Sequence, residues 1–305
     1  MRIGVPRALL YYNYRPALEY LAGEDVAEII VSSATNKLKL EQGLALCDDE
    51  VCLPVKVLMG HVQSLLGDVD ALFLPRIISL EKKRYLCPKF LGLPDMVRAG
   101  LGRKTPLISP AINVGWSRLR QLREGIKSLG SMSGQPLKLW RALDRAARVQ
   151  EQHRRQLAAA LDMPVRRKRV AVLGHAYNIF DEYLNFGILN KLSALGVEPV
   201  TVENFRREHI NQGASGLSKD LFWSYGREVV GAALYCLHSK VVDGVILVAS
   251  FGCGPDSLIT EIIGRRFSAA AIPLMSIILD EHSSGIGLAT RVEAFVDMLN
   301  WRDMA

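Results

Sequence analysis

The sequence predicts an α/β fold built as two Rossmann-like lobes, each with a parallel sheet. Short runs rich in Val, Ile and Leu alternate with segments of helical periodicity, which is typical of βαβ units. This alternation occurs in residues 1–115 and again in residues 166–305, and a polar, helix-favouring stretch at 116–165 separates them. The run at 242–249 is apolar almost throughout, as expected of a strand buried on both faces. We therefore expect a first lobe, a helical connector and a second lobe, with a crevice between the lobes.

The elements of the first lobe follow from apolar runs and from the Pro and Gly residues that end them. We expect strands at 2–5, 26–32, 69–74 and 105–109, and helices at 8–23, 36–47 and 54–67. The connector is expected to be helical from 116 to 161, with a break at 130–136. In the second lobe we expect strands at 168–173, 197–202, 242–249 and 272–278, and helices at 180–196, 219–239, 255–267 and 288–301.

Composition is that of an ordinary globular protein: of 305 residues, 49% are hydrophobic and 23% are charged. No apolar run reaches the roughly 18 residues that a membrane span requires. The first residues lack the long apolar region and cleavage site of a signal peptide. We therefore expect a cytoplasmic protein that does not span a membrane.

The formal charge of +7 gathers largely between residues 98 and 169. Such a basic stretch suits an anionic coenzyme, an acidic protein partner or simply a solvated surface. No nucleic-acid motif accompanies it, so we do not expect nucleic-acid binding. There is also no P-loop, no dinucleotide-binding glycine motif and no nucleophile elbow, so we do not expect this chain to hydrolyse ATP.

Three of the five cysteines occupy similar Pro- and Gly-rich positions next to regular elements. Cys52 begins a helical segment that contains Pro54, Cys87 directly precedes Pro88, and Cys253 lies just past the apolar run at 242–249. Disulfides are not expected in a reducing cytosol, and no C-x-x-C pair indicates a zinc ribbon. Because ligands of open parallel sheets lie at the carboxyl ends of strands, these thiols can face one crevice. We hypothesise that Cys52, Cys87 and Cys253 hold an iron–sulfur cluster there.

The loop GCGPDS explains why Cys253 suits such a ligand. Gly252 and Gly254 remove side chains beside the sulfur, so a bulky group can approach the backbone. Asp256 and Ser257 are expected to satisfy the first N–H groups of the next helix, and we include all four residues in the cofactor site. The plainer alternative is a tight strand-to-helix turn with a buried thiol.

Three thiolates are one fewer than a closed all-cysteine site requires. Cys236 lies in an apolar helical segment, where burial is the expected role. Cys47 ends a helical run five residues before Cys52, and positions five apart do not share a helix face. We therefore expect Cys47 not to be a ligand and one iron to stay open.

Charged residues near the cysteines are candidates for tuning charge and moving protons. Lys56 and Lys89 would offset the charge of thiolates and sulfides, and Glu50 and Glu81 are candidate proton donors. The alternatives are solvated lysines and helix-capping carboxylates. The loop at 174–187, with His175, is either a further ligand contact or an ordinary connection.

The chain resembles the 2-hydroxyacyl-CoA dehydratase group, and in particular the acyl-CoA dehydratase activase-related proteins. The resemblance rests on RIGVPRALLYY, EVCLPVKVLMGHV, PRIISLEKKRYLCPKFLGLPD, GHAYNIFDEYLNFGI, FGCGPDS and DEHSSGIGLATRVEAF. It implies a cytoplasmic iron–sulfur protein of anaerobic metabolism, with a 4Fe–4S cluster held by three cysteines. Carried over to this sequence, those cysteines are Cys52, Cys87 and Cys253. Relatives with an 8Fe–9S double-cubane cluster make that cofactor the alternative.

The resemblance also implies a partner: an ATP-dependent activase of the actin-like superfold that delivers low-potential electrons from a separate chain. The expected function is reduction or reductive dehydration of a small molecule, such as a CoA thioester, at an open-site cluster. The alternatives are a non-catalytic cluster carrier, scaffold or redox sensor, and a structural metal site such as zinc on the same thiolates. The sequence leaves the substrate and the oligomeric state open.

Overall fold

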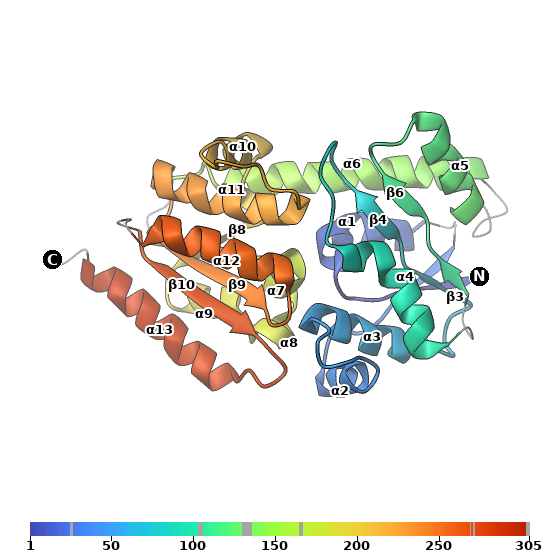
Figure 1. The fold of residues 1–305 in the computed structure, drawn as a ribbon, viewed down its shortest axis with the longest axis horizontal. Coiled ribbons are helices and arrows are strands. Elements are labelled where there is room, and N and C mark those ends of the chain that lie inside the picture. Colours follow the sequence, from blue (N-terminus) through green and yellow to red (C-terminus); the bar gives the residue numbers. More distant parts are fainter. Residues whose placement is uncertain are drawn as a thin grey trace. The chain divides into compact units, whose positions relative to one another are not determined.

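The computed structural model describes residues 1–24, 27–102, 106–129, 136–164, 167–268, 270 and 272–302. The chain forms two compact units (Figure 1). Unit 1 contains residues 1–153 and 222–224, and unit 2 contains residues 154–221 and 225–305. Both units are mixed α/β with parallel strands, which confirms the general fold class that the sequence predicts.

The main sheet of unit 1 has the strand order β2-β1-β3-β5, and every pair is parallel. Ile3, Ala71 and Ile108, one from each of three neighbouring strands, form a small buried cluster within it. All four strands coincide with the apolar runs of the first lobe, and Thr105 of the expected fourth run lies outside the described residues. Their bounds are β1 Arg2–Val5, β2 Glu28–Val31, β3 Ala71–Phe73 and β5 Leu107–Ile108.

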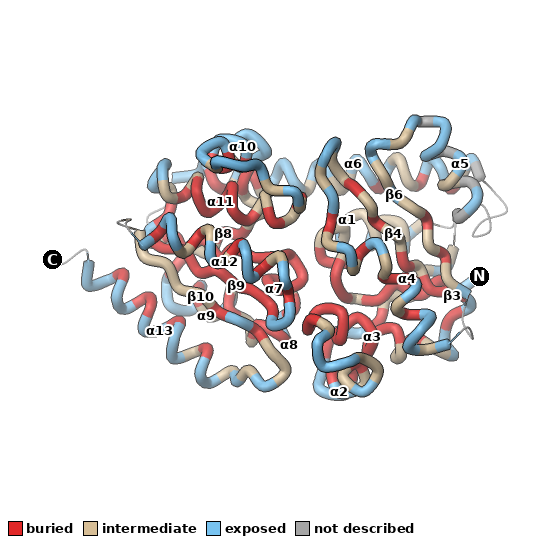
Figure 2. Tube along the Cα trace, viewed as in Figure 1, coloured by how far each residue is buried: buried red, intermediate tan, exposed pale blue. Residues whose placement is uncertain are grey.

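The helices of unit 1 are α1 Leu10–Ala22, α2 Lys37–Ala45, α3 Leu53–Leu65, α4 Pro88–Leu101 and α5 Arg118–Leu129. Helix α3 is buried along most of its length, because its residues are apolar on nearly every side (Figure 2). It packs on α2 through two glycines. A Cβ on Gly43 would lie 1.8 Å from the carbonyl oxygen of Lys56, and one on Gly60 would lie 1.8 Å from that of Lys39. The two backbones therefore touch, and this contact fixes the start of α3, where Cys52 lies.

Unit 1 also contains elements that the apolar pattern does not reveal. The short strands β4 (Arg76–Ser79) and β6 (Ala111–Asn113) form a separate parallel pair. A turn after β4, closed by an ion pair of 2.7 Å between Glu81 and Arg84, leads the chain to Cys87 and α4. Helix α6, Pro136–Ala160, follows residues 130–135, which lie outside the described part, and the boundary between the units falls within α6.

Unit 2 contains a parallel sheet of order β10-β9-β7-β8 covered by helices on both faces (Figure 1). Alternate residues of β7 and β9 pack with α11 and α12 in one core, and Gly244 on β9 lies against Phe295 and Leu299 of α13. Strands β7 and β9 are buried along their whole length (Figure 2). The strands are β7 Arg169–Leu173, β8 Glu198–Thr201, β9 Gly244–Ser250 and β10 Leu274–Leu279. The helices are α7 Ala176–Phe180, α8 Glu182–Asn185, α9 Ile188–Ala194, α10 Arg207–Ala214, α11 Ser224–Ser239, α12 Gly254–Phe267 and α13 Gly285–Arg302.

The two main sheets share one strand order. Counted along the chain within each unit, the order is second, first, third, fourth in both. In such sheets the connections diverge between the first and third strands, and ligands bind at that switch point, outside the carboxyl ends of the strands. In unit 2 the switch point lies between β7 and β9, which pair in parallel.

Three helix predictions are wrong in detail. The expected helix 36–47 ends at Ala45, so Cys47 lies outside it in a turn. The expected helix 180–196 is two helices, α8 and α9, and its first residue, Phe180, ends α7. The breaks arise because Asp181 is extended and both Phe186 and Gly187 are left-handed. The expected helix 219–239 begins only at Ser224, because the backbone of Phe222 instead accepts a hydrogen bond of 3.1 Å from Tyr85. Within the described chain, no helix combines the length and the apolar character that a membrane crossing demands.

Candidate metal and cofactor site

Three cysteines occupy the same position relative to a helix. Cys52, Cys87 and Cys253 are the N-cap residues of α3, α4 and α12, and each helix has Pro in its first or second position. The first turn of a helix has free N–H groups and carries a partial positive charge, which favours a thiolate or another anion nearby. Proline suits this turn because it has no N–H to leave unsatisfied. The local sequence thus sets each sulfur beside a region that stabilises negative charge.

In unit 1 the thiols of Cys47 and Cys87 each lie within electrostatic reach of Cys52. Burial raises the pKa of the Cys47 and Cys87 thiols, and the neighbouring Cys52 raises both further. At Cys87 the backbone N–H groups of Lys89 and Phe90, at the start of α4, act in the opposite direction. Two helix N-termini therefore bring two sulfurs into one region of unit 1, with Cys47 beside them.

The two lysines proposed from the sequence do lie near these thiols. Lys56 is almost fully buried, and its charge lowers the pKa of Cys47 against the effect of burial. Lys89 lowers the pKa of both Cys47 and Cys87. Of the two carboxylates, Glu50 is exposed and Glu81 forms its ion pair with Arg84. That these four residues act in catalysis stays a prediction.

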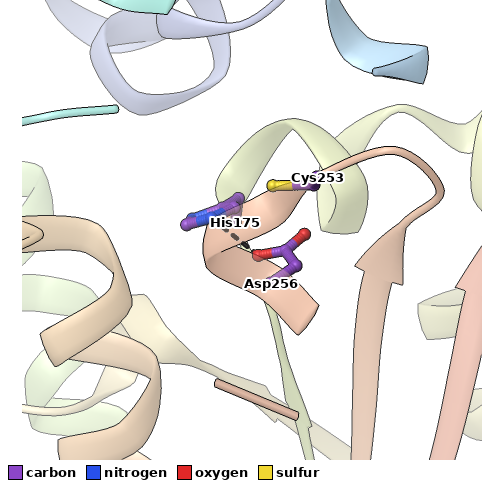
Figure 3. Close-up of side chains that lie close together, drawn as sticks. All are labelled: His175, Cys253 and Asp256. Carbon is purple, nitrogen blue, oxygen red and sulfur yellow. Dashed lines mark ion pairs between the residues drawn. The ribbon is translucent and has the colours of Figure 1, made fainter. Parts of the chain in front are cut away.

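In unit 2, Cys253 lies in a compact group with His175 and Asp256 (Figure 3). His175 follows β7 and is the N-cap of α7, whereas Cys253 follows β9 and Asp256 lies in the first turn of α12. One ligand atom from each residue lies within 4.8 Å of the other two, and all three residues are buried. The sulfur of Cys253 points toward the imidazole ring of His175. The group therefore occupies the switch point of this sheet.

Asp256 is the centre of the hydrogen bonds in this group. Its carboxylate pairs with His175 Nε2 at 2.8 Å, accepts the backbone N–H of Ser250 at 3.1 Å, and accepts from Asn178 Nδ2 at 3.5 Å. The thiol of Cys253 also donates to it. Burial alone would raise the pKa of Asp256, but His175, the Ser250 backbone N–H and the Cys253 thiol hold it below the ordinary value.

The expected capping roles of Asp256 and Ser257 are wrong. Asp256 turns to His175 and Ser250, and the Ser257 hydroxyl donates to the carbonyl of Cys253 at 3.0 Å. The glycines agree better with the sequence argument. Gly252 adopts φ 73°, a conformation that other residues rarely take, and a Cβ on Gly254 would meet nothing within 4 Å. The backbone at Gly254 is thus open on the side where a side chain would lie.

His175 is held by charge in a buried place. Burial would lower its pKa, but the charge of Asp256, the hydrogen bond to Asp256 and the charge of Glu228 raise the pKa above the ordinary value. Its second nitrogen, Nδ1, is buried and has no hydrogen-bond partner among the described residues. Sequence reasoning leaves His175 open between a ligand contact and an ordinary loop residue. The signal that could have found it is spatial: β7 and β9 are neighbours, so the residues that follow them meet.

The donor set fits a metal or an iron–sulfur cluster. Thiolate and imidazole are the ligands of zinc, iron and iron–sulfur centres, and three sulfurs at helix N-termini can support an anionic cluster. Cys52 and Cys87 belong to unit 1 and Cys253 to unit 2, so their joint ligation of one cluster stays a prediction. Cys236, by contrast, is fully buried in α11, and burial raises its pKa to about 12, which leaves it a protonated core thiol.

Comparison with known proteins gives solved structures of low similarity and one protein family. Three structures that match are the SBP FpvC from Pseudomonas aeruginosa in complex with Mn²⁺ (15% identity, 99% of this chain and 99% of that chain, TM-score 0.31), ZnuA (12%, 97% and 98%, 0.31) and the laminin binding protein Lmb of Streptococcus agalactiae (9%, 98% and 99%, 0.31). At TM-scores this low we draw no argument from these likenesses. A search of curated proteins gives no match.

The family match covers residues 2–205. This range contains Cys52, Cys87 and His175, whereas Cys253 and Asp256 lie beyond it. It covers more than half of the chain and agrees with the resemblance that the sequence motifs carry. The chain therefore belongs to the family described as "CoA enzyme activase uncharacterised domain".

Proposed function

We propose that this protein is an iron–sulfur component of the 2-hydroxyacyl-CoA dehydratase-related group, working in the cytoplasm. Its cluster, of the 4Fe–4S type, is held by Cys52, Cys87 and Cys253. It receives low-potential electrons from a separate, ATP-dependent activase and serves the reduction or reductive dehydration of a small molecule such as a CoA thioester. The family membership supports the general assignment.

The observation that carries the proposal is the shared position of the three cysteines. Each is an N-cap residue, and each is followed by Pro at the first or second helical position. An N-cap is normally Ser, Thr, Asp or Asn, whose side-chain oxygen accepts a helix N–H. Cysteine is a poor substitute for that purpose, so its occurrence three times favours a ligand role. The partial positive charge of each helix end would stabilise thiolates and bound sulfide.

The charges around Cys52 and Cys87 support an anionic cofactor. Lys56 is buried and Lys89 half-buried, and both act electrostatically on the neighbouring thiols. Thiolates and bound sulfide would supply negative charge beside these lysines. These lysines would raise the potential of a cluster and help to retain it after reduction.

Three protein thiolates leave one iron of a 4Fe–4S cluster without a cysteine. The bound cluster would supply electron storage at low potential and an open metal position for substrate. The protein's own residues would keep the sulfurs oriented and the charge balanced. An 8Fe–9S double-cubane cluster is the alternative cofactor, and iron and sulfide counts per chain separate the two.

The test is anaerobic purification of single Cys→Ala variants, with iron, acid-labile sulfide and the visible spectrum measured for each. We expect the wild-type protein to be brown with about four irons per chain. Cys52→Ala, Cys87→Ala and Cys253→Ala should each lose most of the iron. Cys236→Ala, the matched control, should keep it because Cys236 is a core residue of α11. Full iron content in Cys87→Ala would rule out the proposed ligand set.

Cys47→Ala should also keep the cluster. The helix argument for excluding Cys47 fails, because the residue lies in a turn after α2. Cys47 differs from the three proposed ligands in another way, because it does not begin a helix. Loss of the cluster in this variant would instead indicate a closed, four-cysteine site, which favours an electron carrier.

The second candidate is a non-catalytic carrier, scaffold or redox sensor. The open space beside Gly254 favours a group bound near Cys253 without showing whether substrate reaches it. EPR spectra of the reduced protein, recorded with and without acyl-CoA thioesters, distinguish the two. A catalytic open site should change its signal with the thioester, whereas a carrier should not.

A further inference from the structure

We propose that His175, Cys253 and Asp256 form a binding site for one divalent transition-metal ion, of the Zn²⁺ type, in unit 2. This inference goes beyond the proposed cluster and shares only Cys253 with it. A chain whose Cys253 is bound to a cluster has no free thiolate for the ion, so the two occupants exclude each other. The ion's site belongs to the cluster-free protein.

The geometry already approaches that of a metal site. The three ligand atoms lie within 4.8 Å of one another. Around a tetrahedral Zn²⁺ ion, bond lengths of about 2.0–2.3 Å place neighbouring ligand atoms roughly 3.3–3.6 Å apart. A small adjustment of the side chains is therefore enough: His175 Nε2 and the Asp256 oxygen, now 2.8 Å apart, must separate slightly, and the wider-spaced atoms must approach. One thiolate, one imidazole and one carboxylate leave the fourth position for water or a small ligand, as in zinc sites with an open position.

The local charge favours a cation. Asp256 is buried and held below its ordinary pKa, and the carboxylate of Glu228 also acts on His175. His175 is only 7% exposed, and its Nδ1 has no hydrogen-bond partner within the described part of the chain. A dication beside the imidazole would balance both carboxylates at once.

A second layer of hydrogen bonds holds the ligands in place. The Ser250 hydroxyl donates to Asn178 Oδ1 at 2.6 Å, and the Ser250 backbone and the Asn178 amide both donate to Asp256. Asn178 is fully buried, and Ser250 is nearly so. Such partners orient ligating side chains and typically contribute 10- to 100-fold in metal affinity. The group is thus organised before any ion arrives.

The binding step is a proton exchange without electron transfer. Two protons leave to the solvent: the thiol proton of Cys253, now donated to Asp256, and the Nε2 proton through which His175 pairs with Asp256. A sulfur–metal bond and a nitrogen–metal bond form in their place. The hydrogen bond between Asp256 and His175 gives way to one metal bond from each residue. Binding should therefore release protons, and affinity should rise with pH.

The test uses the full-length, cluster-free protein with Co²⁺ as the spectroscopic probe and Zn²⁺ as the competitor. We expect one Co²⁺ per chain, with a thiolate-to-cobalt absorption band and the strong visible bands of tetrahedral cobalt. Zn²⁺ should displace it. The Cys52→Ala/Cys87→Ala variant is the matched control and should keep both bands. Cys253→Ser should lose the thiolate band.

Two further variants keep the test decisive if one of them fails to fold. His175→Gln keeps an amide that can donate to Asp256, and Asp256→Asn keeps the carboxyl shape. Each should weaken Co²⁺ binding by at least about tenfold. Unchanged affinity in both folded variants would overturn the proposal. Loss of the ion in the Cys52→Ala/Cys87→Ala variant would also overturn it, because the ion would then lie on the cysteines.

The same variants separate this proposal from the proposed cluster. His175→Gln, purified anaerobically, should keep full iron and sulfide while its cluster-free form loses cobalt affinity. Iron loss in Cys87→Ala with retained cobalt binding would support both proposals. Full iron in Cys87→Ala would contradict the cluster ligands without touching the His175 site.

Discussion

At the scale of single residues, His61 of α3 shows how burial selects one protonation state. The side chain is fully buried, with Nδ1 2.8 Å from the Ser32 hydroxyl and Nε2 2.9 Å from the Thr35 hydroxyl. A neutral imidazole can donate through one nitrogen and accept through the other, which suits two hydroxyl partners. Burial, followed by the charges of Lys39 and Arg7, lowers its pKa to about 3. His61 is therefore neutral at every pH at which the protein is ordinarily handled.

This residue makes stability depend on pH in a defined direction. Between pH 6.5 and about 3 the unfolded chain binds a proton at His61 that the folded chain does not. The contribution is therefore complete above pH 6.5 and is lost as the pH falls. At 1.36 kcal/mol per pH unit, it should remove about 2 kcal/mol from the free energy of unfolding between pH 7 and pH 5.

The measurement is urea unfolding of wild type and His61→Gln at both pH values. The difference in stability between pH 7 and pH 5 should be smaller in the variant by about 2 kcal/mol. His238→Gln, which changes an exposed histidine at the end of α11, should behave like wild type. An equal pH dependence in His61→Gln would mean that His61 titrates normally in the folded protein.

At the scale of elements, the contact between α2 and α3 depends on two glycines. Neither Gly43 nor Gly60 has room for a Cβ, since the nearest atom in each case is a backbone oxygen 1.8 Å away. Backbone atoms cannot move aside as a flexible side chain can. The same contact between α2 and α3 fixes the position of α3 and therefore of Cys52, its N-cap residue. The stability of the protein and the position of this candidate ligand thus depend on the same helix–helix contact.

Gly60→Ala should destabilise the protein by about 3 kcal/mol, at the upper end of overpacking costs. Gly92→Ala in α4 is the matched control, because a Cβ there meets nothing within 4 Å. It should be neutral or stabilising by up to about 1 kcal/mol, since Ala favours a helix over Gly. Thermal and urea unfolding would compare them. Similar stabilities of the two variants would show that α2 and α3 can separate at little cost.

Prediction from sequence succeeds for elements whose signal is local. The strands of both main sheets are continuous Val-, Ile- and Leu-rich runs, and α12 begins where Gly and Pro after Cys253 predict it. The short strands β4 and β6 are only partly buried and have no such run. The break between α8 and α9 depends on Phe186, which adopts a left-handed conformation at φ 53°. Phenylalanine is not a typical turn residue, so the sequence does not predict a turn at that position.

The candidate site also has one part with a local sequence signal and one part without it. The cysteines stand out because Pro follows each one closely, and Pro at a helix start is a local signal. The association of His175 with Cys253 and Asp256 is not local, because Cys253 lies 78 positions after His175 in the sequence. It arises only when β7 pairs with β9. Sequence reasoning therefore finds the sulfurs and names His175 as a possible contact, but it does not join His175 to Cys253.

At the scale of the whole molecule, the chain crosses between the two units more than once. It leaves unit 1 within α6, and residues 222–224 belong to unit 1 although unit 2 surrounds them in sequence. These residues are tied to Tyr85. The Tyr85 N–H donates to the Phe222 carbonyl at 3.1 Å, and the Ser224 N–H donates to the Tyr85 carbonyl at 3.0 Å. Their rings stack, with Tyr85 and Phe222 centroids 4.8 Å apart and planes at 23°.

The attachment of residues 222–224 to Tyr85 explains why α11 begins only at Ser224. It also allows a test of whether these residues are an energetic part of unit 1. If residues 222–224 are an integral part of unit 1, the Tyr85 and Phe222 side chains should be energetically coupled. Stacked aromatic pairs contribute about 0.5–1.5 kcal/mol beyond the area that they bury. Both rings are partly exposed, at 40% and 58%, so we expect a value near the lower end of that range.

A double-mutant cycle of Tyr85→Ala and Phe222→Ala, measured by urea unfolding, would give this coupling directly. Tyr85→Phe is the control: it keeps the ring and the backbone bonds, so its stability and its coupling to Phe222 should match those of wild type. Additive effects of the two Ala variants would mean that the ring contact stabilises nothing. The segment would then be held to unit 1 by its two backbone hydrogen bonds alone, and α11 would be free to begin earlier along the chain.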